Sequence, residues 1–161
     1  MYNEEKRRNM RASAFNDSFK KVEEELPLYN SIVVGDFNLH PFSDGIISMY
    51  GFNAVLDINK AKKGVRSCDG EKIKFYYNPM WKLMGKNDLT LGTYYSDTDS
   101  GGCSFYWYTF DQVLIRPELI DRFVWEEFEI ISEIGEKAFI KNNKIDKENY
   151  SDHLPVKFEI R

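Results

Sequence analysis

The order of hydrophobic patterns along the chain, one helical stripe followed almost entirely by strand patterns, most constrains its fold. Near the N-terminus, apolar residues recur at steps of three to five, close to the period of an amphipathic helix: Met10, Phe15, Phe19, Val22 and Leu26. Residues 1–7 are polar and are predicted to be loose, and Pro27 is predicted to end the helix because a residue before proline avoids the helical region. The rest of the fold must therefore be built mainly from strands.

Three runs carry the strongest strand patterns. Residues 31–34 form a continuous β-branched run, which predicts a strand buried on both faces. Residues 103–115 form a long aromatic run with an expected bend near Thr109, and residues 154–160 alternate as a final strand. Together with the 16% aromatic content, this order predicts an α+β fold whose mixed or largely antiparallel sheet is covered on one face by helix.

Length and composition predict one globular domain spanning residues 1–161. The chain is 42% hydrophobic and carries a formal net charge of -4, so it lacks the basic excess of a general nucleic-acid binder. The basic stretches 6–8 and 60–66 are interpreted as solvated surface. Cys68 and Cys103 do not have metal-ligand spacing, and no leader or membrane span is evident. A cytoplasmic location is the default expectation, unless a leader precedes Met1.

The first candidate site element is the run Gly35-Asp36-Phe37-Asn38, directly after the first predicted strand. If the extended geometry continues, Asp36 and Asn38 point to the same side. An aspartate there can orient a water or accept its proton, and an asparagine can donate to a phosphate oxygen. An Asx turn, in which both side chains only satisfy nearby backbone, explains the same pattern and is preferred for this run taken alone.

The second and third candidate elements lie in the C-terminal half. Asp152 and His153 stand side by side before the last predicted strand, where adjacent residues point to opposite sides. Asp111 lies inside the aromatic run, and a buried carboxylate there would need a partner. His153 is the natural candidate, because an Asp–His hydrogen bond would fix the imidazole tautomer. An exposed strand position for Asp111 is an equally good explanation of that residue alone.

Taken in order, the Gly-Asp-Phe-Asn run, Asp111 before apolar residues, and the Ser-Asp-His-Leu-Pro run resemble the endonuclease/exonuclease/phosphatase superfamily of metal-dependent phosphoesterases. The resemblance implies the C-terminal part of a four-layer α/β/β/α sandwich. It also implies in-line hydrolysis of a phosphate ester with Mg²⁺, or alternatively Mn²⁺, as cofactor. The substrate could be nucleic acid, a phospholipid head group or inositol phosphate, or a small phosphodiester.

The same resemblance implies a role for each candidate residue. Asp36 orients or deprotonates the attacking water. Asp36 and Asp152 are also the carboxylates that bind the metal ion. Asn38 holds the scissile phosphate, His153 stabilises developing charge, and Asp111 orients the imidazole of His153.

The chain also departs from the family pattern. Family members carry an N-terminal half with an asparagine and a metal-binding glutamate, for which no counterpart precedes residue 31. The glutamates at positions 23–25 are interpreted as a solvated helix end. We therefore expect an exposed apolar sheet face, covered by a second copy in a homodimer or by a separate N-terminal half. Two functional interpretations stay open: a hydrolase that is active when completed, and a non-catalytic, truncated or degenerate binding module.

Overall fold

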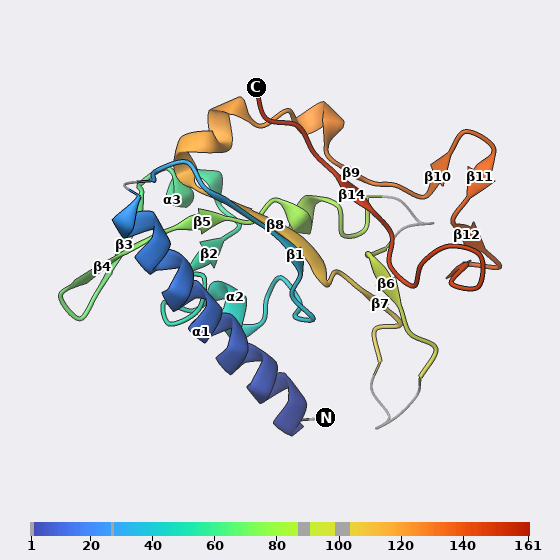
Figure 1. Cartoon of the computed structure of the whole chain (residues 1–161), viewed down its shortest axis with the longest axis horizontal. Helices are drawn as coiled ribbons and strands as arrows, with labels where there is room; N and C mark the ends of the chain where they lie inside the picture. Colours follow the sequence, from blue (N-terminus) through green and yellow to red (C-terminus); the bar gives the residue numbers. More distant parts are fainter. Residues whose placement is uncertain (1, 27, 87–90, 99–103) are drawn as a thin grey trace.

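The computed structural model describes residues 2–26, 28–86, 91–98 and 104–161, and mixes helices and strands as an α+β fold (Figure 1). The helices are α1 Tyr2–Glu25, α2 Asp44–Ile47 and α3 Ile58–Ala61, with 3₁₀ turns η1 Met80–Lys82, η2 Pro117–Arg122 and η3 Trp125–Glu127. The strands are β1 Ile32–Asp36, β2 Ala54–Val55, β3 Val65–Cys68, β4 Glu71–Lys74, β5 Tyr76–Tyr77, β6 Tyr94–Tyr95, β7 Trp107–Tyr108, β8 Asp111–Ile115, β9 Glu129–Ile130, β10 Glu133–Ile134, β11 Lys137–Ala138, β12 Ile140–Lys141, β13 Lys144–Ile145 and β14 Val156–Lys157. No helix among the described residues is both long enough and apolar enough to cross a membrane.

The central sheet has four strands in the order β1-β8-β5-β2 and is mixed, as predicted. β1 and β5 both run antiparallel to β8, and β2 runs parallel to β5. β1 therefore lies at an edge, and the prediction that it is buried on both faces is wrong. Val33 is buried against the core on one face, but Val34, which points to the opposite face of this edge strand, is 58% exposed.

Both faces of the sheet are covered. On one face, Ala12 of α1 and Ile46 of α2 pack with Leu114 of β8. On the other face, η2 and the segment that follows it pack Phe123 and Phe128 against β5 and β8. Val113 and Ile115 of β8 are fully buried in that second cluster. The sheet face that was expected to be exposed and apolar is therefore covered at β8 by residues from the last third of the chain.

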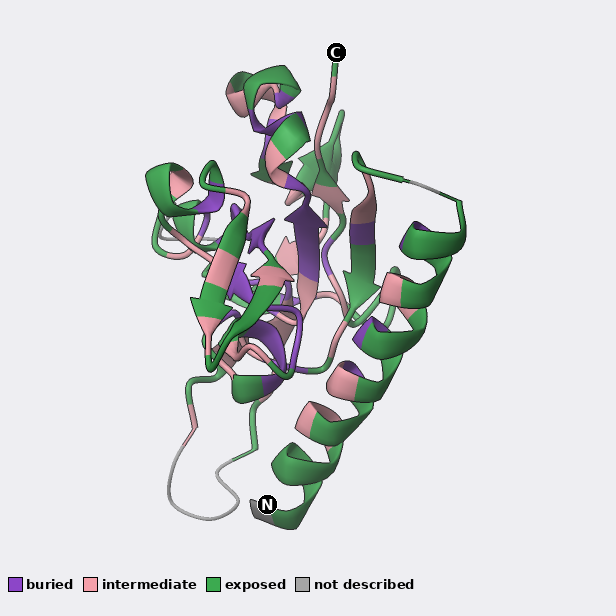
Figure 2. Cartoon of the chain, turned by 90° about the vertical axis from the view of Figure 1, so that its left-hand side faces the viewer, coloured by how far each residue is buried: buried purple, intermediate pink, exposed green. Residues whose placement is uncertain are grey.

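Helix α1 is longer than predicted and packs on a different face. The helix is described from Tyr2, so the prediction of a loose segment is wrong for residues 2–7, while Met1 lies outside the described residues. The helix ends at Glu25, and Pro27 also lies outside the described residues. Small and polar residues, including Ala12 and Asn16, face the core, and most of the predicted apolar stripe remains exposed. Figure 2 shows that most of the surface of α1 is exposed. A hydrogen bond of Asn16 favours this orientation of the helix, because its side-chain amide donates to the Gly51 carbonyl at 2.6 Å in the contact between α1 and the loop after α2.

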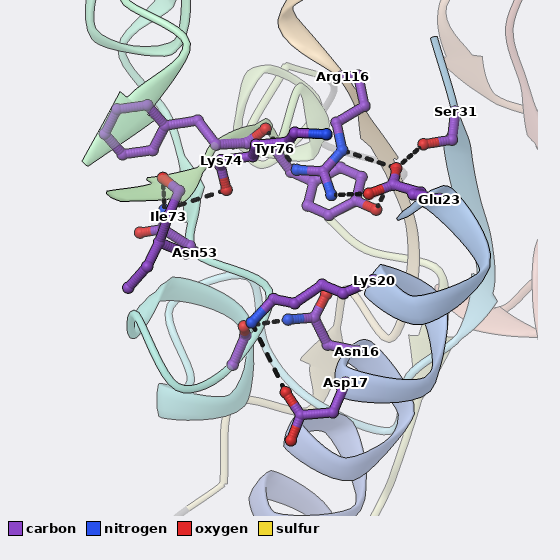
Figure 3. Close-up of polar contacts among 12 residues, drawn as sticks. Asn16, Asp17, Lys20, Glu23, Ser31, Asn53, Ile73, Lys74, Tyr76 and Arg116 are labelled. Carbon is purple, nitrogen blue, oxygen red and sulfur yellow. Dashed lines mark hydrogen bonds and ion pairs between the residues drawn. The ribbon is translucent and has the colours of Figure 1, made fainter. Parts of the chain in front are cut away.

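A buried ion pair ties the end of α1 to the end of β8 (Figure 3). The Arg116 guanidinium donates to both carboxylate oxygens of Glu23, stacks at 3.6 Å over the Tyr76 ring and donates to the Phe75 carbonyl at 2.9 Å. Ser31 also donates to Glu23. The interpretation of Glu23 as part of a solvated helix end is therefore wrong: it is the one glutamate of the three that has a cationic partner in the core.

Two polar stretches contain regular structure. Residues 57–70 contain α3, capped by the Asp57 side chain, and strand β3. Residues 141–149 contain β13, which pairs with β12. The predicted bend near Thr109 is confirmed, because the aromatic run divides there into β7 and β8. Cys103, the expected start of that run, lies outside the described residues.

Candidate functional site

Pairing between β1 and β8 brings two of the predicted carboxylates together. The register aligns Asp36 directly opposite Asp111, at the end of β1 and the start of β8. Directly opposed residues of an antiparallel pair project to the same face of the sheet. The two aspartates, 75 positions apart in sequence, thus share one side of one sheet corner.

His153 reaches the same corner from the C-terminal segment. Residue 153 forms an isolated antiparallel bridge with Tyr94, and the amide of Leu154 donates to the Thr93 carbonyl at 2.7 Å. The Nδ1 atom of His153 lies 2.7 Å from Oδ2 of Asp111, so the predicted Asp–His hydrogen bond is present. The bond places the proton on Nδ1 when the imidazole is neutral and directs Nε2 away from Asp111.

Asp36, Asp111 and His153 form a compact group of possible ligands. One ligand atom from each of them lies within 4.8 Å of the other two. Asp111 and His153 are each about one quarter exposed, whereas Asp36 is open to solvent. A water molecule or a small ester can therefore reach the group, while Asp111 and His153 are partly shielded from solvent.

Asn38 lies beside this group but is engaged locally. Its backbone amide donates to Oδ1 of Asp36 at 2.8 Å, and its side-chain amide donates to Oδ2 at 2.7 Å, while its φ of 49° is left-handed. This is the Asx turn anticipated from the sequence, and it coexists with the cluster. Its carbonyl accepts from the Arg8 guanidinium at 3.2 Å, which places the first half of α1 next to the site.

Asp152 does not join the group. It is exposed, and among the described residues the compact ligand group contains only the other three. Ser151 accepts the backbone amide of His153 at 3.1 Å, so the loop is shaped to present position 153. The role on the metal side that the resemblance implies for Asp152 remains a prediction.

Sequence reasoning missed the residues that support the group. The Thr93 hydroxyl accepts the backbone amides of Phe110 and Asp111, both at 3.1 Å, and so holds the start of β8. The Tyr94 ring lies 4.9 Å from the His153 ring, between centroids, and restricts its position. Neither residue belongs to a recognisable motif, so only spatial proximity could have identified them.

A buried amide chain anchors the loop that follows β1. Gln112, next to Asp111, donates to the Leu39 carbonyl at 2.6 Å and accepts from the Asn78 side chain at 2.8 Å. Asn78 in turn accepts the amide of Met80 at 3.0 Å. Because successive strand residues point to opposite faces, Asp111 serves the site while Gln112 holds the loop from behind.

The second histidine, His40, does not belong to the group. It is half-buried, and its ring lies 5.8 Å from Phe42 and 5.7 Å from Phe105, between centroids. Burial lowers the pKa of His40 below its ordinary value, so it is neutral at physiological pH. This environment fits a packing role.

Comparisons of the chain with models of known protein families, with curated proteins and with solved structures found no match.

Proposed function

We propose that the chain provides the catalytic corner of a metal-dependent phosphoesterase that hydrolyses a phosphate ester by in-line attack of water. The observation that carries the proposal is the convergence of Asp36, Asp111 and His153 within 4.8 Å from three distant segments. The order of the motifs, which resembles the endonuclease/exonuclease/phosphatase superfamily, supports the same chemistry. In this proposal the mixed β1-β8-β5-β2 sheet corresponds to one of the two sheets of a four-layer sandwich.

The donor set fits a hard divalent cation. Mg²⁺ prefers oxygen ligands, keeps several waters and needs only one or two carboxylates. Asp36 supplies one at the group, whereas Asp152, the second that the resemblance implies, would have to turn towards the group from its exposed position. The imidazole nitrogen nearby would also suit Mn²⁺. A bound divalent ion would polarise the phosphate and lower the pKa of a coordinated water.

The protein groups have separable tasks. Asp36 has the exposure needed to orient the attacking water and accept its proton. The Asp111–His153 hydrogen bond leaves Nε2 as the imidazole atom that can face a phosphate oxygen, where protonation at Nε2 would neutralise developing negative charge. Asn38 uses one amide hydrogen on Asp36 and keeps a second with which it can donate to the ester.

Hydrolysis of bis(p-nitrophenyl) phosphate and of p-nitrophenyl phosphate, with Mg²⁺ or Mn²⁺, tests the proposal. Asp36→Asn and His153→Gln should each lower kcat by about a hundredfold or more, because each removes a group that transfers or stabilises a proton. Asp146→Asn is the matched control, since Asp146 makes the same kind of side-chain pairing with Asn149 away from the site. Equal rates for all three variants, or metal-independent hydrolysis, would contradict a metal-dependent phosphoesterase.

A non-catalytic binding module is the second candidate. It is favoured by one observation: both carboxylate oxygens of Asp36 are already engaged by Asn38. If that turn is the whole role of Asp36, Asp36→Asn should lower thermal stability without affecting any metal-dependent rate. Measuring melting temperature and hydrolysis on the same samples separates the two candidates.

A further inference from the structure

One face of α1 is apolar, exposed and not covered by the rest of the described chain. Phe15, Val22 and Leu26 are 56%, 44% and 59% exposed, although Phe15 also touches Phe52, at 6.3 Å between ring centroids. At about 100° per residue, these three side chains and Arg11 lie within roughly 60° of arc on the helix surface. Spacings of four, seven and four residues are those of a helix that packs along another helix.

The exposed face continues onto the free edge of the sheet. Between α1 and β1 runs a groove of about 530 Å³, lined by Arg8, Arg11 and Phe15 on one side and by Val34 on the other. β1 is the last strand of its sheet, and Val34 is 58% exposed there. Uncovered sheet edges beside apolar surface favour association with another chain.

The charges along α1 indicate which kind of partner covers this exposed face. The first half of the helix carries a basic run through Arg11, whereas the last turn is acidic at Glu24 and Glu25 and has no basic residue. Acidic side chains at a helix C-terminus are unfavourable, because the macrodipole is negative at that end. An antiparallel helix with the same sequence would supply the missing cations from its own first half.

The apolar positions have the same symmetry. Reflection about positions 18–19 exchanges Phe15 with Val22 and Arg11 with Leu26, next to Glu25. In an isologous contact each residue meets the counterpart required by a two-fold axis. The apolar residues of the face therefore meet apolar residues of a second copy, and its basic residues meet acidic ones.

We propose that this face is the contact surface of a homodimer, in which two α1 helices pack antiparallel across a two-fold axis. Phe15 packs on the partner's Val22, and Arg11 pairs with the partner's Glu25. The second copy also shields Val34 and the free edge of β1. The proposal does not depend on hydrolysis, because the paired side chains of α1 and Val34 are not members of the Asp36–Asp111–His153 group, although Asp36 and Asn38 line the same groove.

Sedimentation velocity of the full chain over a wide concentration range tests the proposal. The wild type should sediment as a dimer at micromolar concentrations. Arg11→Glu and Glu25→Arg should each weaken dimerisation by about tenfold or more, since two surface pairs turn from attractive to repulsive. Both side chains are exposed, and circular dichroism would verify that each variant keeps its helix.

The decisive experiment mixes the two variants. A chain with Arg11→Glu and a chain with Glu25→Arg carry complementary charges, so an equimolar mixture should form a heterodimer with an affinity near that of the wild type. Glu24→Arg is the matched control, because it makes the same charge change on the opposite side of the helix and should leave the affinity unchanged. A wild-type monomer at every concentration, a dimer that ignores both substitutions, or a mixture that fails to associate would each overturn the proposal.

Discussion

Breaking the buried Glu23–Arg116 pair should be among the most damaging single changes to stability. Both residues are only 3% exposed, and Glu23 accepts hydrogen bonds from Arg116 and Ser31. Glu23→Gln keeps the size of the side chain but removes its charge, which leaves a guanidinium cation buried without a counter-ion. Such a loss costs about 3–5 kcal/mol of the free energy of unfolding. For a chain of this length, that corresponds to a fall in Tm of about 6–20 °C.

The pair also predicts how stability depends on pH. Burial alone raises the pKa of Glu23, but the hydrogen bonds from Arg116 and Ser31 and the charge of Arg116 outweigh it, so the pKa lies below its ordinary value of 4.5. A carboxyl whose folded pKa is depressed contributes stability above its unfolded pKa and loses it as pH falls through the folded pKa. The wild type should therefore lose stability as pH falls below about 4.5. Glu23→Gln should lack this part of the acid-induced loss.

Urea unfolding followed by tryptophan fluorescence measures both effects. Glu24→Gln is the control, because the neighbouring carboxylate is exposed and its loss should change the free energy of unfolding by less than about 0.5 kcal/mol. A double variant, Glu23→Met with Arg116→Met, should be less damaging than the sum of the single changes, since it leaves no unpaired charge. If Glu23→Gln and Glu24→Gln were equally mild, the assigned role of the buried pair would be refuted.

Three further predictions follow from the structure. Gln112→Leu should lower the free energy of unfolding by about 1–3 kcal/mol in urea titrations, because the buried Leu39 carbonyl loses its donor; an unchanged midpoint would contradict this. Gly51→Ala should cost about 1–3 kcal/mol or prevent folding, since the added Cβ would lie 2.2 Å from the Gly45 carbonyl oxygen, and a wild-type Tm would show that the loop can yield. Mn²⁺ at a hundredfold excess over its Kd should stabilise the wild type by about 2.7 kcal/mol in thermal scans and Asp36→Asn far less, and equal shifts would place the ion elsewhere.

The catalytic candidates could be predicted because their signals are local. Asp36 and Asn38 follow a β-branched run, and His153 precedes an alternating one, so strand ends and polar residues coincide in the sequence itself. Pairing of Asp111 with His153 was also predictable, because a carboxylate inside a strand pattern needs a partner and only two histidines are available. The structure confirms that hydrogen bond at 2.7 Å.

The supporting residues have no such signal. Thr93 and Gln112 are single polar residues that belong to no sequence motif. Thr93 bonds to Asp111, 18 positions away, and Gln112 bonds to Leu39, 73 positions away. The packing face of α1 was misassigned for a related reason. Periodicity treats a glutamate as a solvent-facing residue, and nothing near Glu23 in the sequence reveals the cation that neutralises it.

The sequence by itself determined the class of the fold, the existence of one long helix followed by strands, and the polar strand ends that form the candidate site. Periodicity and turn chemistry act over a few residues, and this range is enough to specify such elements. Only the tertiary structure decided which face of α1 is buried, that β1 is an edge strand, and that Glu23 meets Arg116 from 93 positions away. These outcomes depend on which distant groups satisfy one another's charges and hydrogen bonds, and a linear pattern does not contain that information.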